Sequence, residues 1–492
     1  MAKGLAGAAA ERRVESARVH GDAWTGGSCA LGRGILSASD TPRFSTMPVP
    51  RSVSRRRFLG AASSVTAALA FPALLRSAPG GSPGQRLNVA CVGVGGRGWA
   101  AVQGVSSQNL VAFADVDDVR AARTFREHPD VPRFRDYRVM LERLGKEIDA
   151  VTVSTPDHMH YPIARAALEL GKHVFVEKPL GHTVWEAREL SRLASEKRVA
   201  TQMGNQGHAA EGMRLLREWY QAGILGEIRE IHSWTDRPIW PQGLKGFDHS
   251  QRIPVVPETL DWDRWLGVAA ARQYDPGYLP FNWRGFWDFG TGALGDMGCH
   301  QMDGAFWAFD LGAPAWVEPV SANATELSAP TSSIVRYGFP ARGARPAVQW
   351  TWYDGNLGPP LPPELEEGRT LPENSTLIVG TRASVIAQAN YFTVRIVPEV
   401  RMRELAPTLP PKTIPRIPGG DHFAEWINAC KGGPAAGSHF GYSGPLTEMV
   451  LLGNVALRAR RRIEWDSAAF RITNLPAANA LLTKAYRPGW GV

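Results

Sequence analysis

Cysteine is scarce in this chain of 492 residues, and its spacing excludes two classes of site. No C-x-x-C pair occurs, which excludes a cysteine zinc site of the usual spacing and a readable disulfide framework. The four cysteines are Cys29, Cys91, Cys299 and Cys430. We expect Cys91 to be a small core residue in a buried strand. After residue 82 there is no apolar run of 18 or more residues, so we predict no membrane span there.

An excess of basic charge is also missing from most of the chain. The formal net charge is +8, but residues 1–80 hold 11 of the 55 Lys and Arg and only 4 of the 47 Asp and Glu. The other residues therefore carry 44 basic and 43 acidic side chains. The basic balance belongs to the N-terminal leader, and we expect no nucleic-acid partner. The length allows two or three domains.

The leader resembles a bacterial export signal. Residues 54–60 read S-R-R-R-F-L-G and precede a moderately apolar run of small residues to Phe71. The paired arginines before Phe-Leu resemble the twin-arginine type, and a chance basic stretch before an amphipathic helix is the alternative. We therefore predict that 47–82 is signal and linker, that the twin-arginine machinery is a partner, and that the protein is periplasmic or otherwise extracytoplasmic. Residues 1–46 are predicted to be disordered or untranslated, because Met47 is a more natural start.

Residues 85–205 alternate between strand and helix patterns. Strands are expected at 88–94, 110–114, 149–154, 173–177 and 199–203, and helices near 98–105, 118–127, 137–144, 160–170 and 183–197. This alternation predicts an α/β protein whose N-terminal Rossmann domain has a doubly wound parallel sheet.

Residues 206–492 predict a C-terminal α+β domain with a large, mainly antiparallel sheet, which would bind substrate. Strands are expected at 227–235, 315–322, 333–338, 346–353, 375–379, 383–388 and 392–397, and helices near 212–222, 296–309, 421–431 and 445–460. The section 237–292 is rich in Trp, Pro, Gly and Asp, which suggests loops that cover a site.

A glycine-rich turn follows the first expected strand. Gly93, Gly95 and Gly98 fill the pattern G-x-G-x-x-G, with Gly96 and Arg97 inside it. In this pattern the first glycine allows the tight turn, the second lets the backbone approach a pyrophosphate, and the third lets the helix pack on its strand. The helix N-terminus then supplies N–H groups to the phosphates. The turn therefore predicts a dinucleotide site.

An acidic residue stands at the expected distance from this turn. Asp115 ends the second expected strand, about 20 residues after Gly95, where a carboxylate would hold the adenosine ribose hydroxyls. A carboxylate there would repel a 2′-phosphate, so we predict NAD as the cofactor, with NADP less favoured. Arg97 in the turn weakens that preference slightly.

Two short motifs end later strands of the parallel sheet, where ligands bind in open α/β folds. Residues 154–160 read S-T-P-D-H-M-H, and we expect Thr155 and His160 to contact the cofactor. His158 either lines the cofactor or belongs to a surface loop in which Asp157 caps a helix.

The second motif, E-K-P at 177–179, ends the next strand. There Lys178 would lie beside a nicotinamide and could polarise or deprotonate a substrate hydroxyl, while Glu177 would contact the cofactor. An ordinary Glu-Lys turn is the alternative.

A third motif pairs an acid with a histidine. Asp296 and His300 are spaced i, i+4, so they share one helical face, and a carboxylate can orient a histidine that acts as acid or base. Helix N-capping by Asp296 is an alternative use. A metal site of Asp296, His300 and Asp303 is disfavoured, because no further convincing ligand is visible and Lys178 offers another electrophile. We therefore predict no metal.

Taken together and in this order, the glycine turn, Thr155 with His160, E-K-P, and Asp296 with His300 resemble the glucose–fructose oxidoreductase/inositol dehydrogenase/MocA (Gfo/Idh/MocA) family. The resemblance covers nearly all of 85–492. It implies that Lys178, Asp296 and His300 are the catalytic group and flank the sugar or polyol carbon that exchanges hydride with the nicotinamide. By analogy with the family, it also implies a homo-oligomer formed through the exposed sheet.

Aromatic residues concentrate in the section 237–292. They suggest a carbohydrate-binding lid, because aromatic faces stack on sugars; the alternative is that several of them are core. The tryptophans of the section are Trp240, Trp262, Trp265, Trp283 and Trp287, with Trp234 just before it. We take His208, Trp283 and Asp303 as candidates for substrate contact.

The sequence therefore predicts an exported NAD(P)-dependent oxidoreductase that acts on a small carbohydrate: a sugar, polyol or glycoside. Because cofactor would be loaded before export, we expect it to be held tightly and used in a redox-closed cycle. The family also contains NAD-dependent glycosidases. The twin-arginine signal and the G-R-G turn at 96–98 resemble the signal and turn of those enzymes. A non-catalytic NAD-holding protein is a third hypothesis, disfavoured because Lys178, Asp296 and His300 are all present.

Overall fold

A computed structural model describes residues 85–247, 254–388 and 390–491. The predicted extension 1–46 and the predicted export signal 47–82 lie outside these residues. None of the helices in the described ranges has the length and hydropathy needed to cross a membrane.

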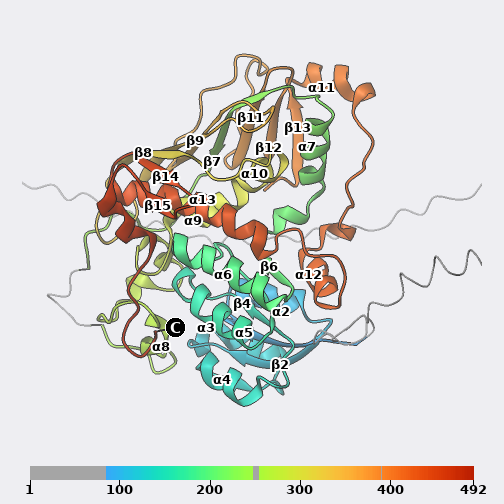
Figure 1. Cartoon of the computed structure of the whole chain (residues 1–492). Helices are drawn as coiled ribbons and strands as arrows, with labels where there is room; N and C mark the ends of the chain where they lie inside the picture. Colours follow the sequence, from blue (N-terminus) through green and yellow to red (C-terminus); the bar gives the residue numbers. More distant parts are fainter. Residues whose placement is uncertain (1–84, 248–253, 389, 492) are drawn as a thin grey trace, which may run out of the picture. The chain divides into compact units, whose positions relative to one another are not determined.

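The N-terminal half contains a six-stranded parallel sheet (Figure 1). Its strands are β1 (Asn88–Val92), β2 (Asn109–Ala114), β3 (Arg133–Phe134), β4 (Ala150–Val153), β5 (His173–Val176) and β6 (Thr201–Met203). The order β3-β2-β1-β4-β5-β6 confirms the predicted doubly wound Rossmann sheet. β4 and β5 are buried throughout, as expected where helices cover both faces. β3 has only two residues and was not predicted.

Helices connect these strands near the predicted positions. They are α2 (Arg97–Gly104), α3 (Asp118–Glu127), α4 (Tyr137–Leu144), α5 (His160–Glu169) and α6 (Val184–Lys197). Side-chain caps fix three starts: Asp117 accepts N–H groups in the first turn of α3, Asp136 accepts one in the first turn of α4, and Thr183 forms a capping box with Glu186 in α6.

The C-terminal half contains a nine-stranded sheet with the order β13-β12-β11-β7-β10-β9-β8-β14-β15. Its strands are β7 (Ile228–Trp234), β8 (Trp316–Ala322), β9 (Ser332–Phe339), β10 (Val348–Asp354), β11 (Ser375–Gly380), β12 (Ser384–Gln388), β13 (Thr393–Val397), β14 (Ile463–Asp466) and β15 (Arg471–Ile472). β7 and β10 run parallel and the other pairs are antiparallel, which confirms the predicted mainly antiparallel sheet. β14 and β15 were not predicted.

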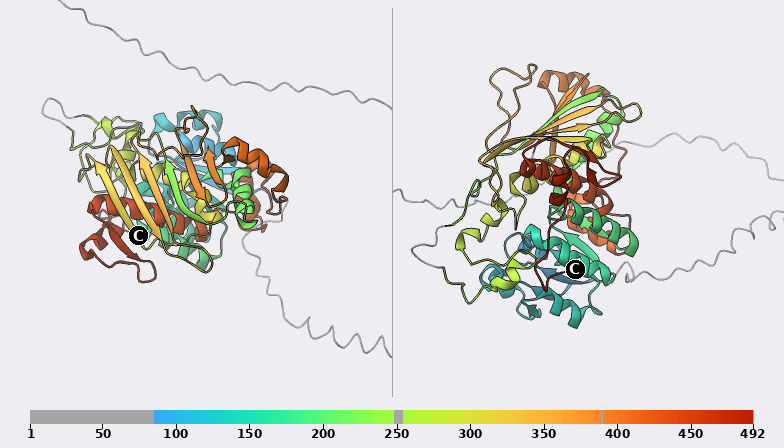
Figure 2. Two further views of the ribbon diagram at one scale, coloured as in Figure 1. Left: turned by 90° about the horizontal axis from the view of Figure 1, so that it is seen from above. Right: turned by 60° about the vertical axis from the view of Figure 1, so that its left-hand side comes forward.

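Helices fill the space between the two sheets (Figures 1 and 2). The helices of this half are α7 (Glu211–Gln221), α8 (Trp262–Leu266), α9 (Gly292–Gln301), α10 (Asp303–Ala308), α11 (Glu399–Leu405), α12 (His422–Cys430) and α13 (Phe440–Ala459). α13 is buried along most of its length and packs against α6, α9 and β8, so it joins the two halves. It begins before the predicted residue 445, and Pro445 lies inside the helix.

The predicted helix at 296–309 is wrong in its boundaries. The structure has two helices there, and α9 starts at Gly292, so Asp296 lies inside α9 and does not cap it. Thr291 is the residue at the N-cap position. Gly295 permits this early start, because a Cβ on it would lie 2.0 Å from Thr291 Oγ1. The run of glycines at 290–298 reads as a loop in sequence, which is why the start was misplaced.

The aromatic section 237–292 is mostly irregular where it is described, with α8 and two short 3-10 turns. Part of it hydrogen-bonds to the loop between β2 and α3. Asp261 N donates to Val116 O at 2.8 Å, and Asp118 N donates to Thr259 O at 3.0 Å. The section is therefore attached to the Rossmann half beside the end of β2.

Candidate active site

A cavity of about 620 Å³ lies at the carboxyl ends of the parallel strands. The Rossmann half contributes the glycine turn and the ends of β2, β4 and β5, and the C-terminal half contributes α8, residues 279–284, His300 and Asn390. A site at strand ends is where ligands bind in open α/β folds, and the volume suits a cofactor or small molecule.

The glycine turn fits a dinucleotide because side chains are sterically excluded from it. A Cβ on Gly93 would lie 2.7 Å from Ser154 O, and one on Gly98 would lie 1.9 Å from Gly93 O. Gly93 and Gly96 also have φ values of +74° and +53°, which favour glycine. The backbone of the turn can therefore approach a pyrophosphate closely at the start of α2.

Asp115 lines the cavity at the end of β2, where it was predicted. Its Oδ2 accepts the N–H of Val94 at 2.8 Å, and its Oδ1 accepts the N–H of Asp117 at 3.0 Å. Burial raises the pKa of Asp115 to about 6, against the lowering effect of these backbone donors. The carboxylate therefore supports the glycine turn and still has acceptor capacity for a ribose hydroxyl.

Two arginines of the glycine turn and α3, Arg97 and Arg120, line the cavity together with Asp115, and the sequence analysis singled out only Arg97. Arg97 donates from Nε to Glu177 Oε1 at 2.8 Å, so its charge is partly neutralised. Arg120 lines the cavity and is exposed, and its side chain has no ion pair among the described residues. A Cβ on Gly96 would lie 2.9 Å from Arg120 Nη2, so this guanidinium lies against the turn.

His160 does not line the cavity, contrary to its predicted cofactor contact. Its ring nitrogens lie 2.9 Å from Thr155 O and 2.7 Å from Pro179 O. The ring therefore joins the loops that follow β4 and β5. Thr155 does line the cavity, and its Oγ1 is buried without a partner in the described structure.

His158 and Asp157 fit neither of the two predicted alternatives. His158 is fully buried, and its ring nitrogens face the carbonyl oxygens of Phe289 and Trp265. Asp157 is buried and accepts the hydroxyl of Thr291 at 2.7 Å. Both residues thus hold the strand-end loop against the C-terminal half, and neither lies in a surface loop.

Lys178, Asp296 and Arg284 form one cluster, in which Asp296 is buried and the two cations are partly buried. Lys178 Nζ donates to Asp296 Oδ1 at 2.7 Å and to Asp296 O at 2.8 Å. Arg284 Nε donates to the same Oδ1 at 3.0 Å. Burial alone would raise the pKa of Asp296, but Lys178 and Arg284 hold it well below its usual range. Lys178 and Arg284 line the cavity, whereas Asp296 lies behind them.

His300 lines the same cavity but does not pair with Asp296 as predicted. The carboxylate of Asp296 is occupied by the two cations, and His300 Nδ1 is buried with no partner in the described structure. Burial, reinforced by the nearby Lys178, lowers the pKa of His300 to about 3. The imidazole is therefore neutral at neutral pH, and one of its ring nitrogens can accept a hydrogen bond.

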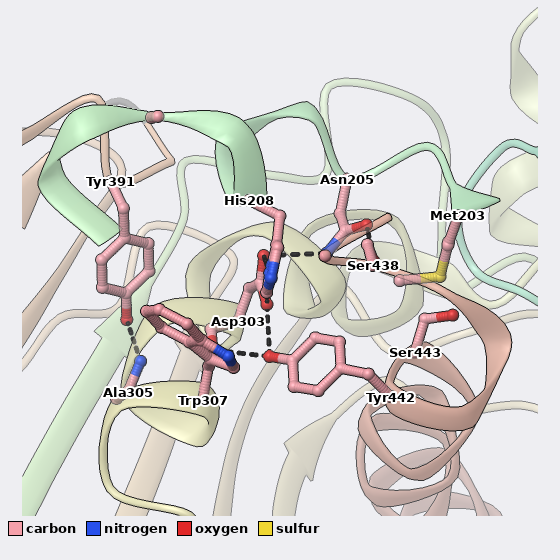
Figure 3. Close-up of polar contacts among 12 residues, drawn as sticks. Met203, Asn205, His208, Asp303, Ala305, Trp307, Tyr391, Ser438, Tyr442 and Ser443 are labelled. Carbon is pink, nitrogen blue, oxygen red and sulfur yellow. Dashed lines mark hydrogen bonds and ion pairs between the residues drawn. The ribbon is translucent and has the colours of Figure 1, made fainter. Parts of the chain in front are cut away.

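His208 and Asp303, predicted to contact substrate, lie away from the cavity in a buried hydrogen-bond network (Figure 3). Asp303 accepts from His208 Nδ1 at 3.0 Å, from Asn205 Nδ2 at 2.8 Å and from Tyr442 OH at 2.5 Å. Ser438 in turn donates to Asn205. The carboxylate is thus satisfied by protein donors, and the network links α10 to the start of α13.

Most tryptophans of the aromatic section are core residues. Trp240, Trp265, Trp283 and Trp287 are each less than 9% exposed, as is Trp234. Trp265 and Trp283 also line the cavity, which agrees with the position expected of Trp283. Sequence reasoning missed Arg284, because a single arginine in an aromatic stretch carries no motif.

No cluster of three or more His, Cys, Asp or Glu side chains that could hold a metal ion occurs in the residues the structure describes.

Two family models match the chain. Residues 87–205 match the NAD-binding Rossmann fold of the oxidoreductase family GFO_IDH_MocA, and residues 227–328 match its C-terminal alpha/beta domain. Among curated proteins, Glycosyl hydrolase family 109 protein 1 of Shewanella sp. (strain ANA-3) is 31% identical over 207 residues, which cover 36% of this chain and 44% of that protein. The chain spans only 43% to 57% of the length of the first curated relatives it matches.

Solved structures share the fold at low sequence identity. The WlbA dehydrogenase from Bordetella pertussis, in complex with NADH and UDP-GlcNAcA, is 15% identical with a TM-score of 0.53, and the match covers 78% of this chain and 99% of that one. The aldose-aldose oxidoreductase from Caulobacter crescentus, complexed with glycerol, is 14% identical with a TM-score of 0.51, and the match covers 77% and 100%.

Proposed function

Because the chain belongs to the Gfo/Idh/MocA oxidoreductase family, we propose that it is an NAD-dependent oxidoreductase acting on a sugar, polyol or glycoside. The observation that carries this proposal is one cavity lined by both the glycine turn and the side chains of Lys178 and His300. A nucleotide held at the turn could extend to the two side chains that can move a proton. The activities named for the relatives above support a carbohydrate substrate.

Lys178 and His300 have complementary roles in this proposal. The neutral imidazole of His300 accepts the proton of the substrate hydroxyl, and the ammonium of Lys178 stabilises the negative charge that develops on that oxygen. Asp296 keeps Lys178 in place through two hydrogen bonds. A nicotinamide bound at the glycine turn would supply the hydride-accepting chemistry for the carbon that bears this hydroxyl.

A substrate panel tests this function. Purified protein would be incubated with NAD and with a set of free sugars, polyols and aryl glycosides, while cofactor absorbance and product are both measured. Oxidation or rearrangement of any of these substrates supports the proposal. If none is changed in the presence of bound cofactor, the proposed function is wrong.

A glycoside-cleaving reaction is the second candidate, and the family 109 glycosyl hydrolases among the relatives favour it. In that reaction a ring carbon is oxidised, the aglycone is eliminated, and the hydride returns to the sugar. Release of the aglycone without net NADH distinguishes it from simple oxidation in the same panel.

Asp115 is proposed to select NAD over NADP. Replacing Asp115 with Ala should weaken NAD binding roughly 10- to 100-fold, as for loss of a charged hydrogen-bond partner. It should weaken NADP less, because Arg120 at the turn is available to a 2′-phosphate. Titration of both nucleotides above pH 6, where Asp115 is ionised, measures the two constants.

The matched control is Asp118→Asn, which alters a partly exposed acid of α3 that pairs with Arg135 and does not itself line the cavity. This variant should bind both nucleotides normally. An equal loss of NAD and NADP affinity in Asp115→Ala, or tighter NADP binding by the unaltered protein, would refute the assignment.

We also infer that the protein acts outside the cytoplasm, is exported by the twin-arginine route and forms a homo-oligomer. The first two inferences are supported by the basic-apolar pattern at 54–71, and the third is supported by analogy with the family.

A further inference from the structure

One arginine of the aromatic section, Arg284, joins the cluster formed by Lys178 and Asp296. Arg284 lies in a short turn, Asn282–Gly285, and its guanidinium carbon is 4.1 Å from the ring centroid of Phe281 and 4.3 Å from that of Trp283. Its Nε is bonded to Asp296, and its side chain is 18% exposed. Stacking on two rings and one directional hydrogen bond fix the plane of the guanidinium.

The outer nitrogens of Arg284 are free to bind a ligand. Neither Nη1 nor Nη2 has a hydrogen-bond partner among the described residues, and neither is a fully buried orphan atom. Arg284 lines the cavity next to Lys178 and His300. The guanidinium therefore presents unused N–H donors to the space that the substrate would enter.

The acids near Arg284 are already engaged by protein donors. Asp296 pairs with both Lys178 and Arg284. Asp157 lines the cavity and accepts the hydroxyl of Thr291, and Glu177 lines it and pairs with Arg97. The outer N–H groups of Arg284 are therefore available to an anionic group of a ligand.

We propose that Arg284 binds a carboxylate of the substrate, so that the enzyme acts on a sugar acid in preference to the neutral sugar. A guanidinium group matches a planar carboxylate, because its nitrogens can donate two parallel hydrogen bonds to the two carboxylate oxygens. This inference rests on the proposed function, and it identifies the substrate class of the same site.

Paired substrates test the inference. The ratio of kcat/KM for glucuronate to that for glucose, and for galacturonate to galactose, would be measured in the unaltered protein and in Arg284→Gln, with glucose 6-phosphate as a third anion. We expect the unaltered protein to prefer the acids and the Gln variant to lose on the order of 10- to 100-fold of that preference. The Arg284→Lys variant should keep part of the preference for acids, since lysine retains the positive charge but lacks the planar set of N–H donors.

The control is Arg272→Gln. Arg272 belongs to the same section, pairs with Asp288 and lies 4.9 Å from the ring centroid of Phe289, but it does not line the cavity. This variant should leave the acid-to-neutral ratio unchanged, whatever it does to stability.

The outcomes separate the two proposals. If no carbohydrate is turned over by the unaltered protein, the proposed function fails. If neutral sugars are turned over and Arg284→Gln leaves the ratio unchanged, or if the phosphate is preferred, the carboxylate assignment is wrong. If the variant is inactive on every substrate, equilibrium binding of glucuronate and glucose to its cofactor-bound form decides: loss confined to glucuronate supports the assignment, and equal loss overturns it.

Discussion

Lys178→Ala should lower turnover by about 10²- to 10³-fold, the usual effect of removing a group that stabilises negative charge on oxygen in the transition state. NAD binding and the fold should persist. Removing one partner from a buried pair is normally destabilising, but Arg284 still pairs with Asp296 in this variant. Steady-state rates, NAD titration and the circular dichroism spectrum test these three expectations together.

Lys197→Ala is the matched control, because within the described residues this exposed lysine at the end of α6 makes one hydrogen bond, at 3.3 Å to Glu169 O. It should retain the full rate. Asp296→Asn provides a second comparison, since it removes the anion between two cations and should cost more stability than Lys178→Ala. Near-normal turnover in Lys178→Ala would exclude its catalytic role.

The order of elements was readable from the sequence because it depends on local pattern. Short, mostly apolar strands such as β4 and β5, caps such as Asp117 and Thr183, and the glycine turn each act within a few residues of chain. The i, i+4 spacing of Asp296 and His300 likewise places both on α9. Such features follow from helix and strand geometry alone.

The partners of the charged residues were not readable, because they depend on contacts between distant parts of the chain. The spacing suggested that Asp296 would orient His300, yet it pairs with Lys178, 118 residues away, and with Arg284. His208 and Asp303 were expected near substrate. They are separated by 95 residues in the sequence, and in the structure they are hydrogen-bonded to each other. A buried carboxylate pairs with whichever cation or hydrogen-bond donor the fold places beside it, and the sequence does not show which residue that is.

Polar residues near the strand ends were also misassigned for a physical reason. His160 and His158 stand where ligand contacts are expected, but both rings bind backbone carbonyl groups of neighbouring loops. Loops that follow parallel strands leave carbonyl groups unpaired, and buried side chains must satisfy them. Position at a strand end therefore predicts proximity to the site better than it predicts contact with the ligand.

Protein purified without added NAD should carry bound nicotinamide cofactor and complete many turnovers on its correct substrate. This prediction rests on the export proposed above: a protein exported already folded would take its cofactor with it, and little free NAD would be available outside the cytoplasm to replace it. A cofactor that stays bound must return to its starting state in every cycle. The hydride taken from one sugar carbon then returns to the same sugar after elimination or epimerisation, or to a second sugar.

Such retention needs a dissociation constant on the order of nanomolar, or about −12 kcal/mol. Two segments that border the cavity could provide the contacts for such tight binding. One is the aromatic section, which is hydrogen-bonded to the loop after β2. The other is the C-terminal tail, whose Trp490 is 8% exposed, lines the cavity and lies under the guanidinium of Arg138 at 4.0 Å.

The Trp490→Ala variant should therefore lose cofactor during gel filtration. The control variant Trp316→Ala should retain it, because Trp316 lies in β8 and does not line the cavity. Cofactor content after denaturation, and turnovers per protein without added NAD, are the two measurements. The unaltered protein should show cofactor near one per chain and product far above it. If it is purified empty and forms product only in proportion to added NAD, the cycle is not redox-closed, and an external acceptor must reoxidise the NADH instead.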